Sequence, residues 1–219
     1  MTTRIIIVHP YPASIVPMSE AFARLWPEAA KYDLLDDSLY TEMDEKGTIS
    51  PVVVPRLRLL FEYAVGARAD GIIFAGSTFG PAVDQARIGF RVPILKPDEA
   101  MAEAAVAAGR RIALLATAKR ALPVIAGGIQ EVAAQAANPT TVEIHHVEGA
   151  HAAMAKGNRA EHDRLIAACA AGITGCDVLV LGQISMASAA ALIPPRPGCA
   201  VMTTPDSAVA KIRALIGQG

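Results

Sequence analysis

Arg4–Pro10 reads RIIIVHP and Arg111–Thr117 reads RIALLAT, so one short strand pattern occurs twice in this chain. A second pair, Asp70–Gly80 (DGIIFAGSTFG) and Asp177–Ala187 (DVLVLGQISMA), keeps the same offset of 107 residues (4 to 111, 70 to 177). Each stretch is an apolar run that ends in turn residues, which is typical of a buried parallel strand. The repetition predicts two copies of one α/β unit.

Strands and helices alternate in both copies. In the first copy we expect strands at 4–8, 32–35, 71–75 and 92–95, helices at 19–30 and 55–68, and an irregular segment at 36–50. In the second copy we expect strands at 112–116, 142–147, 178–181 and 199–202, with helices at 122–136, 162–171 and 207–216. This alternation predicts parallel sheets with right-handed crossovers. The predicted fold class is therefore α/β, with two pseudo-symmetric lobes that arise from an internal duplication. Each lobe is a mostly parallel sheet flanked by helices. The first lobe comprises residues 1–98 with 205–219, and the second comprises residues 99–204.

The composition indicates a compact protein with a small-molecule ligand. The chain has 219 residues, of which 53% are hydrophobic, and a formal net charge of −1. Scattered charge gives no electrostatic reason to expect nucleic acid or an anionic membrane as a partner. Neither a secretory leader nor an apolar run of bilayer length is found, so we expect a cytoplasmic location. Cys169, Cys176 and Cys199 lack metal-type spacing and are expected to be buried, reduced thiols.

The ends of the expected strands locate the candidate site. In open parallel sheets, ligands bind beyond the carboxyl ends of the strands, near the point where the strand order reverses. This rule predicts one cleft surrounded by His9, Gly76, Thr117 and Gln183. The 107-residue offset pairs Gly76 with Gln183, and Thr78 with Ser185.

Two hydroxyl residues form the expected anion-binding part of the site. Ser77 and Thr78 follow a strand and precede a helix that begins near Pro81, so we expect them to act as N-caps. Hydroxyls and unpaired N–H groups at the positive end of a helix suit a carboxylate. Ser185 and the backbone of Met186 are expected to supply a matching site in the second copy.

The chain as a whole resembles the aspartate/glutamate/hydantoin racemase superfamily, in particular its small aspartate/glutamate racemase-like members. The resemblance lies in HPYPASIVP near the start, GSTFGPAVDQAR, VPILKPDEAM, GRRIALLAT and LGQISMA. It implies two pseudo-symmetric lobes, a small carboxylate substrate and no cofactor. It also implies proton transfer at the carbon next to the carboxylate by two cysteines, one from each lobe. Homodimers are common among such enzymes, but no feature of this sequence identifies a contact surface.

The sequence departs from that family pattern at both cysteine positions, which are Gly76 and Gln183 here. Neither residue can act as a general base, so two-thiol racemisation is not expected. His9 titrates near neutrality and is the first candidate for moving protons, although a histidine that only holds its loop explains the position equally well. By the same resemblance, Lys119 lies where the decarboxylase and hydantoin branches have a tyrosine that helps to bind the substrate. Lys119 is a candidate to pair with a second carboxylate or, if desolvated, to act as a base, although a solvated surface lysine is the more common outcome. Ser14, within the HPYPASIVP motif, is expected to contact substrate.

Three functions fit these residues. The favoured one is a cofactor-independent isomerase or racemase acting at a carbon alpha to a carboxylate. The second is a lyase. Gly76, Ser77 and Thr78 resemble the first site of the arylmalonate decarboxylase branch, which has a glycine next to Thr and Ser residues that bind a carboxylate. That branch keeps a cysteine where this chain has Gln183. The third is a non-catalytic protein that binds small carboxylates. His145, His146, His151 and His162 lack a completing Asp, Glu or Cys at a recognised spacing, so no metal is expected.

Overall fold

The computed structural model describes residues 2–43 and 48–217, which fall into two compact units. The first unit comprises Met1–Pro97 with Ala208–Gly219, and the second comprises Asp98–Ser207. Both units are α/β with one parallel sheet of four strands, so the predicted fold class is confirmed. Within the described ranges, no helix is both long and apolar enough to cross a membrane.

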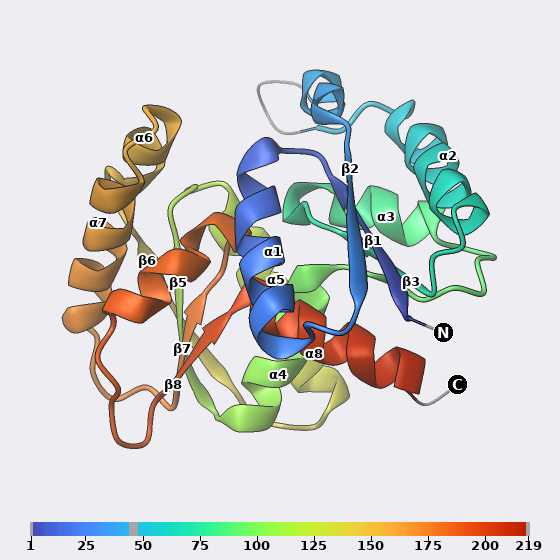
Figure 1. The fold of residues 1–219 in the computed structure, drawn as a ribbon. Coiled ribbons are helices and arrows are strands. Elements are labelled where there is room, and N and C mark those ends of the chain that lie inside the picture. Colours follow the sequence, from blue (N-terminus) through green and yellow to red (C-terminus); the bar gives the residue numbers. More distant parts are fainter. Residues whose placement is uncertain (1, 44–47, 218–219) are drawn as a thin grey trace. The chain divides into compact units, whose positions relative to one another are not determined.

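The first unit is built on strands β1 (Arg4–His9), β2 (Ala30–Leu35), β3 (Gly71–Phe74) and β4 (Ile94–Leu95). They are ordered β2-β1-β3-β4 and pair in parallel throughout. Figure 1 shows β1 and β2 running side by side. The chain moves outward from β1 to β2 and then returns to the other side of β1, so the strand order reverses between β1 and β3. The carboxyl ends of these two strands are therefore the expected place for a ligand.

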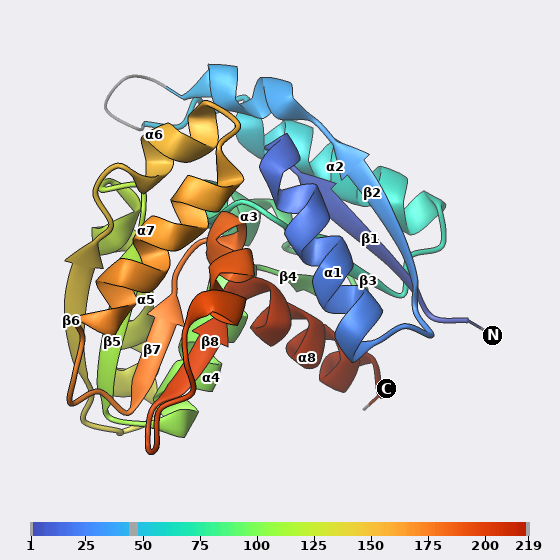
Figure 2. The ribbon, with the colours of Figure 1, turned by 60° about the vertical axis from the view of Figure 1, so that its left-hand side comes forward.

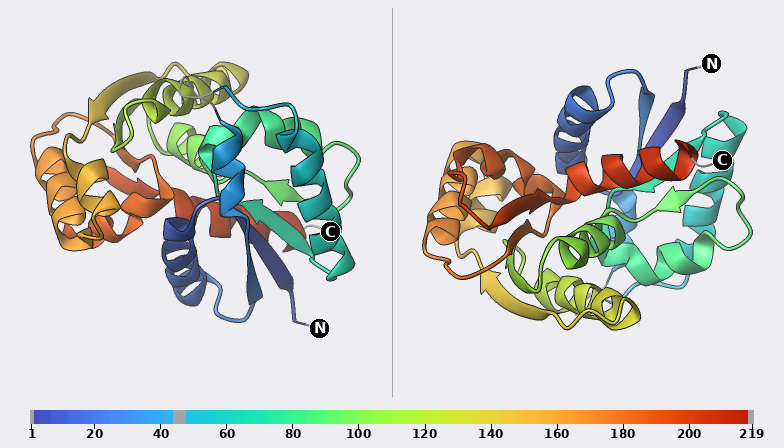
Figure 3. Two further views of the ribbon diagram at one scale, coloured as in Figure 1. Left: turned by 90° about the horizontal axis from the view of Figure 1, so that it is seen from above. Right: turned by 90° about the horizontal axis from the view of Figure 1, so that it is seen from below.

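Alternate strand residues in the first unit face different helices. Ile6, Val8, Ile72 and Phe74 pack with α2 (Val53–Gly66) and α3 (Gly80–Ala86). The opposite face carries α8 (Thr204–Gly217), whose Ile212 and Ile216 approach Gly71. Helix α1 (Ile15–Leu25) contacts α8 through Arg213, which donates to the carbonyl oxygen of Leu25 at 3.0 Å. Arg213 also lies over the ring of Trp26 and pairs with Glu28, just after α1. Figure 3 shows α1 and α2 on opposite sides of the sheet.

The second unit repeats this arrangement with β5 (Arg111–Ala116), β6 (Thr141–His146), β7 (Val178–Leu181) and β8 (Ala200–Thr203). Their parallel order, β6-β5-β7-β8, is visible in Figure 2. One face packs on α4 (Pro97–Ala108) and α5 (Ala121–Gln135). The other face packs on α6 (Ala150–Ala155), α7 (Arg159–Ala171) and the 3-10 segment η4 (Ile184–Leu192). The order reverses between β5 and β7, the counterpart of β1 and β3.

The duplication extends to the polar contacts at the starts of the strands. Asp70 accepts the N–H of Arg4 at 2.7 Å, and Asp177, 107 residues later, accepts the N–H groups of Arg110 and Arg111 at 3.0 and 2.9 Å. Asp177 also accepts hydrogen bonds from the Arg111 guanidinium. The Arg111 side chain and these two N–H groups hold the pKa of Asp177 well below its usual range. Each aspartate therefore satisfies N–H groups at the starting edge of a sheet, away from the candidate site.

Several element boundaries differ from those expected. Helix α1 occupies Ile15–Leu25 rather than 19–30, because Pro27 disfavours helical geometry at the residue before it. The segment 36–50 includes a 3-10 helix, η2 (Asp37–Glu42), while its residues 44–47 lie outside the described residues. Helix α6 begins after Gly149, whose φ is +77°, and was not expected.

The first prediction concerns the core of the first unit. Phe61 of α2 is fully buried and contacts Phe74 and Phe90 edge to face, whereas Tyr63 on the same helix is 65% exposed. Replacing Phe61 by Ala should lower the free energy of unfolding by about 3–5 kcal/mol, because it removes buried contacts and leaves a cavity. Tyr63→Ala is the matched control and should change it by less than about 0.5 kcal/mol. Urea denaturation of both variants checks this, and equal losses would contradict the assigned core.

Candidate functional site

His9 ends β1 and is fully buried, with a side chain on each of its ring nitrogens. Ser14 Oγ lies 2.6 Å from Nδ1, and Asp33 Oδ1 lies 3.0 Å from Nε2. Lys31 pairs with the other carboxylate oxygen of Asp33, so Asp33 is an acceptor and Nε2–H donates to it. Burial lowers the pKa of His9, and the hydrogen bond and charge of Asp33 oppose this shift without overcoming it. His9 is therefore placed to fix the loop after β1, and neither nitrogen is free to reach a substrate.

Ser14 shares in this internal network. Its hydroxyl lies 2.6 Å from His9 Nδ1 and 2.7 Å from the carbonyl oxygen of Tyr11, and its side chain is buried. The single hydroxyl hydrogen serves one of these two acceptors. The structure thus places Ser14 in the turn that carries Tyr11, where its polar atom is already used.

Gly76, where the resemblance predicts the first cysteine, has no space for a side chain. A Cβ atom built there would overlap the ring of Pro10 and lie 3.0 Å from Phe74 Cε1. Because β1 and β3 pair directly, the residues that follow them, Pro10 and Gly76, are forced together. A proline ring is rigid, so a thiol at this position would require the backbone to move.

Ser77 and Thr78 follow Gly76 in a 3-10 turn, η3 (Ser77–Phe79), rather than capping a helix. Helix α3 begins at Gly80 with Phe79 at its N-cap position and no side-chain cap, so the expected capping roles are wrong. The reason is that the turn closes through main-chain bonds, among them Phe79 N–H to Gly76 O at 3.2 Å. Consequently the two hydroxyls are not consumed by capping, and Ser77 is half-buried while Thr78 is exposed.

Two tyrosines stand beside these hydroxyls in the first unit. Tyr40 lies beside the Thr78 side chain, and its ring contacts Phe79 edge to face. Tyr11, directly after Pro10, packs against Tyr40 with ring centroids 5.9 Å apart. Burial raises the pKa of Tyr40 more than Thr78 lowers it, so its phenol keeps its proton across the neutral range. Tyr40 is nevertheless 36% exposed, so its hydroxyl is a candidate proton donor.

In the second unit, three donors converge on a single oxygen atom, Gln183 Oε1. Thr117 N–H donates at 2.7 Å, the Thr117 hydroxyl at 3.0 Å and Ala118 N–H at 3.0 Å. This arrangement settles the orientation of the amide, because only its carbonyl oxygen can accept three hydrogen bonds. Nε2 of Gln183 therefore points away from these donors and offers two N–H groups.

The other residues expected at the second site are placed less favourably. Ser185 lies inside η4 rather than before a helix, and Met186 is buried with its N–H donated to Gln183 O at 2.9 Å. That N–H is not available to hold a carboxylate. Lys119 is exposed next to Ala118. His146, at the end of β6, lies 3.2 Å through Nε2 from the carbonyl oxygen of Thr117 and is also exposed.

The two units thus place equivalent residues at equivalent positions but with different chemistry. Pro10 corresponds to Thr117 and Gly76 to Gln183, each 107 residues apart. In the first unit the pair is a steric contact, because proline has no N–H and glycine no side chain. In the second unit it is a set of hydrogen bonds. The sequence alone identified the positions, but it missed the partner Pro10 and the phenol of Tyr40, which lies in a segment without strand or helix periodicity.

Comparison with known proteins identifies the family. The model of the Asp/Glu/Hydantoin racemase family matches residues 19–212, so the chain belongs to this family. A comparison with curated proteins found no match.

Solved structures of the same fold cover almost the whole chain. Aspartate racemase from Picrophilus torridus is 12% identical, with a TM-score of 0.70 over 98% of this chain and 94% of that one. Allantoin racemase from Klebsiella pneumoniae is 19% identical, with a TM-score of 0.69 over 99% and 89%. A glycine-to-cysteine variant of arylmalonate decarboxylase, in a sulfate-associated form, is 17% identical, with a TM-score of 0.65 over 99% and 94%. At these identities the similarity shows a shared fold.

The second prediction tests the packing at Gly76. Gly76→Ala should lower the free energy of unfolding by about 1–3 kcal/mol, because the new methyl group overlaps Pro10. Gly80→Ala is the matched control, since nothing lies within 4 Å of a Cβ at that position. Thermal denaturation of the two variants provides the measurement. An equally stable Gly76→Ala variant would show that the site can accept a side chain.

The third prediction concerns the pH dependence that His9 confers. Because its pKa is lowered in the folded state, the unfolded chain binds more protons below pH 6.5 and stability falls as the pH falls from 7 toward 5. His9→Gln should reduce that decline, while His151→Gln, at an exposed position, should leave it in place. Urea midpoints at pH 7, 6 and 5 check this. An unchanged pH slope in His9→Gln would contradict a depressed pKa.

Proposed function

We propose that the protein is a cofactor-independent isomerase that moves a proton at the carbon next to the carboxylate of a small acid, without a pair of thiols. The observation that carries the proposal is the cluster of hydroxyls at the end of β3: those of Ser77 and Thr78, which cap no helix, with the Tyr40 phenol beside Thr78. The racemase family and its aspartate and allantoin racemase neighbours support this class of reaction.

The hydroxyls of Ser77 and Thr78 bind the substrate carboxylate in this proposal. Removal of the α-proton moves negative charge onto the carboxylate oxygens, so fixed donors at those oxygens stabilise the transition state more than the ground state. The N–H groups at the start of a helical turn lack acceptors within that turn and can add to this set. In the second unit, the Nε2 hydrogens of Gln183 are fixed donors at the position where the family pattern has its second cysteine.

Proton transfer is assigned to Tyr40 and Lys119. Tyr40 keeps its proton at neutral pH and is accessible, which are the properties of a general acid. Lys119 is exposed beside the Gln183 donors and is assigned the role of base. His9 supports the site by fixing the loop that carries Pro10 and Tyr11, and it is not assigned a transfer step.

One observation favours a second function, a decarboxylase acting on a malonate-like diacid. A decarboxylase needs a single proton donor, because loss of carbon dioxide generates the carbanion. The Tyr40 phenol is such a donor, and the Pro10 ring leaves no room at Gly76 for a second side chain that could move protons. The structural likeness to arylmalonate decarboxylase is consistent with this alternative.

The fourth prediction separates these functions in one experiment. Small mono- and dicarboxylates, amino acids and hydantoins are screened by thermal shift, and each ligand that stabilises the protein is followed by proton NMR in deuterium oxide. An isomerase incorporates deuterium at the α-carbon without net consumption, whereas a decarboxylase consumes the diacid. Stabilisation with neither signal would contradict both enzymatic assignments and leave a carboxylate-binding protein.

Variants assign the roles within that experiment. Tyr40→Phe should reduce exchange by about 10²-fold or more, while Tyr63→Phe should not change it. The double change Ser77→Ala with Thr78→Ala should weaken ligand binding by about 10-fold or more, because each charge-assisted hydrogen bond contributes about 1.5–3 kcal/mol. Lys119→Met should reduce deuterium exchange. Lys156→Met, also at an exposed position, is the control and should not change it. Full activity of Tyr40→Phe would remove Tyr40 as the acid.

A further inference from the structure

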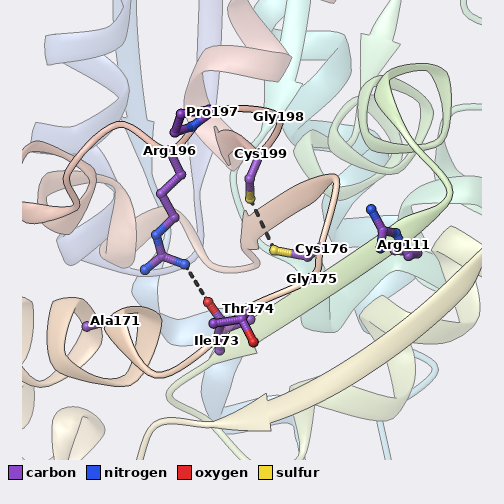
Figure 4. A pocket seen from close by; sticks show the side chains of 10 residues that line it. All are labelled: Arg111, Ala171, Ile173, Thr174, Gly175, Cys176, Arg196, Pro197, Gly198 and Cys199. Atoms are coloured by element: carbon purple, nitrogen blue, oxygen red, sulfur yellow. Dashed lines mark hydrogen bonds between the residues drawn. The ribbon is translucent and has the colours of Figure 1, made fainter.

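The second unit holds two cysteines at the edge of its sheet opposite to the carboxyl ends of the strands. Cys176 precedes β7 and Cys199 precedes β8, two strands that pair in parallel with Val178 opposite Ala200. Their Sγ atoms lie 3.1 Å apart, and Figure 4 shows the two side chains pointing toward each other. Both are free thiols, since a disulfide has an S–S distance of about 2.05 Å.

The thiols are accessible from a cavity of about 430 Å³. Figure 4 shows this cavity with the residues that line it, including Arg111, Arg196 and both cysteines. The sequence predicts buried thiols, but Cys169, Cys176 and Cys199 are all half-buried. Cys176 and Cys199 lie in the turns ahead of their strands rather than within the sheet, which explains their exposure. A small oxidant can therefore reach this pair.

The loop that carries Cys199 is held in place by hydrogen bonds. The Arg196 guanidinium donates to the carbonyl oxygens of Ile173 at 2.7 Å and Ala170 at 2.5 Å. Cys199 N–H in turn donates to Arg196 O at 3.2 Å. On the other side, Asp177, next to Cys176, is fixed by its bonds to Arg111. The two sulfurs are thus brought together by anchored segments.

We propose that Cys176 and Cys199 form an oxidisable dithiol, which a hydroperoxide converts into an intramolecular disulfide. In the first step one of the two sulfurs attacks hydrogen peroxide, the O–O bond breaks, and its sulfenic acid and water form. In the second step the other sulfur attacks the sulfenic sulfur, the S–O bond breaks, and a second water leaves as the disulfide forms. Two thiols are oxidised and one peroxide is reduced to two waters.

The geometry lets either cysteine take the first step. Burial, with a further contribution from neighbouring Cys176, raises the pKa of Cys199 to about 11. The two sulfurs lie 3.1 Å apart, so whichever cysteine is oxidised first, its neighbour is in place to complete the disulfide. The disulfide closes a ring around residues 177–198, which contain β7, Gln183 and η4. Oxidation therefore restrains the segment that carries the second-unit site residues.

The fifth prediction tests the dithiol directly. The native full-length protein is treated with hydrogen peroxide, and its free thiols and intact mass are measured. The thiol count should fall from three to one, with a mass loss of about 2 Da and a peptide linking Cys176 to Cys199. The midpoint of thermal unfolding should rise by about 5 °C or more and return on reduction, because the ring restricts the unfolded chain.

Matched variants make the result specific. Cys169→Ser should behave like the natural protein, whereas Cys176→Ser and Cys199→Ser should form no intramolecular disulfide and show no rise in the unfolding midpoint. If a cysteine variant does not fold, peptide mapping of the oxidised natural protein still decides the pairing. Retention of three thiols under excess peroxide, or a link that includes Cys169, would overturn the proposal.

Discussion

The direct pairing of β1 with β3, and of β5 with β7, is the constraint on which the site in each unit depends. Crossover connections place these strands side by side although another strand and at least two helices intervene in the sequence. The residues that follow two paired parallel strands lie next to each other. Pro10 therefore meets Gly76, and Thr117 meets Gln183. These two contacts decide which side chains the strand ends can hold.

The two units satisfy this constraint in opposite ways, and the difference limits the chemistry. A rigid ring against a glycine closes the first position to any side chain, so a thiol has no place there. Three donors on one amide oxygen hold Gln183 as a neutral hydrogen-bond donor at the second. What remains are donors that can stabilise negative charge on a carboxylate, and the protonated phenol of Tyr40. This combination fits proton transfer next to a carboxylate and provides no thiol for it.

The duplicated apolar strands made the fold predictable from the sequence, because buried parallel strands leave a periodicity and turn signal that survives in both copies. The same offset located Gly76, Gln183 and Thr117 at strand ends. The roles of side chains were less predictable, since they depend on contacts between distant segments. The sequence leaves His9 two roles, moving protons or holding its loop, and its contacts with Asp33 from the neighbouring strand and with Ser14 favour the second. Tyr40 was missed because its position beside Thr78 follows from the path of an irregular segment.

The central claim is that the end of β3 binds a carboxylate through Ser77 and Thr78. The most direct measurement is a titration of the ¹⁵N-labelled protein with sodium malonate, followed by amide NMR against a sodium chloride control of equal ionic strength. The account predicts saturable shifts of the Ser77 and Thr78 resonances that are lost when both residues are replaced by alanine. Shifts that leave these two amides unchanged, or that sodium chloride reproduces, would contradict it.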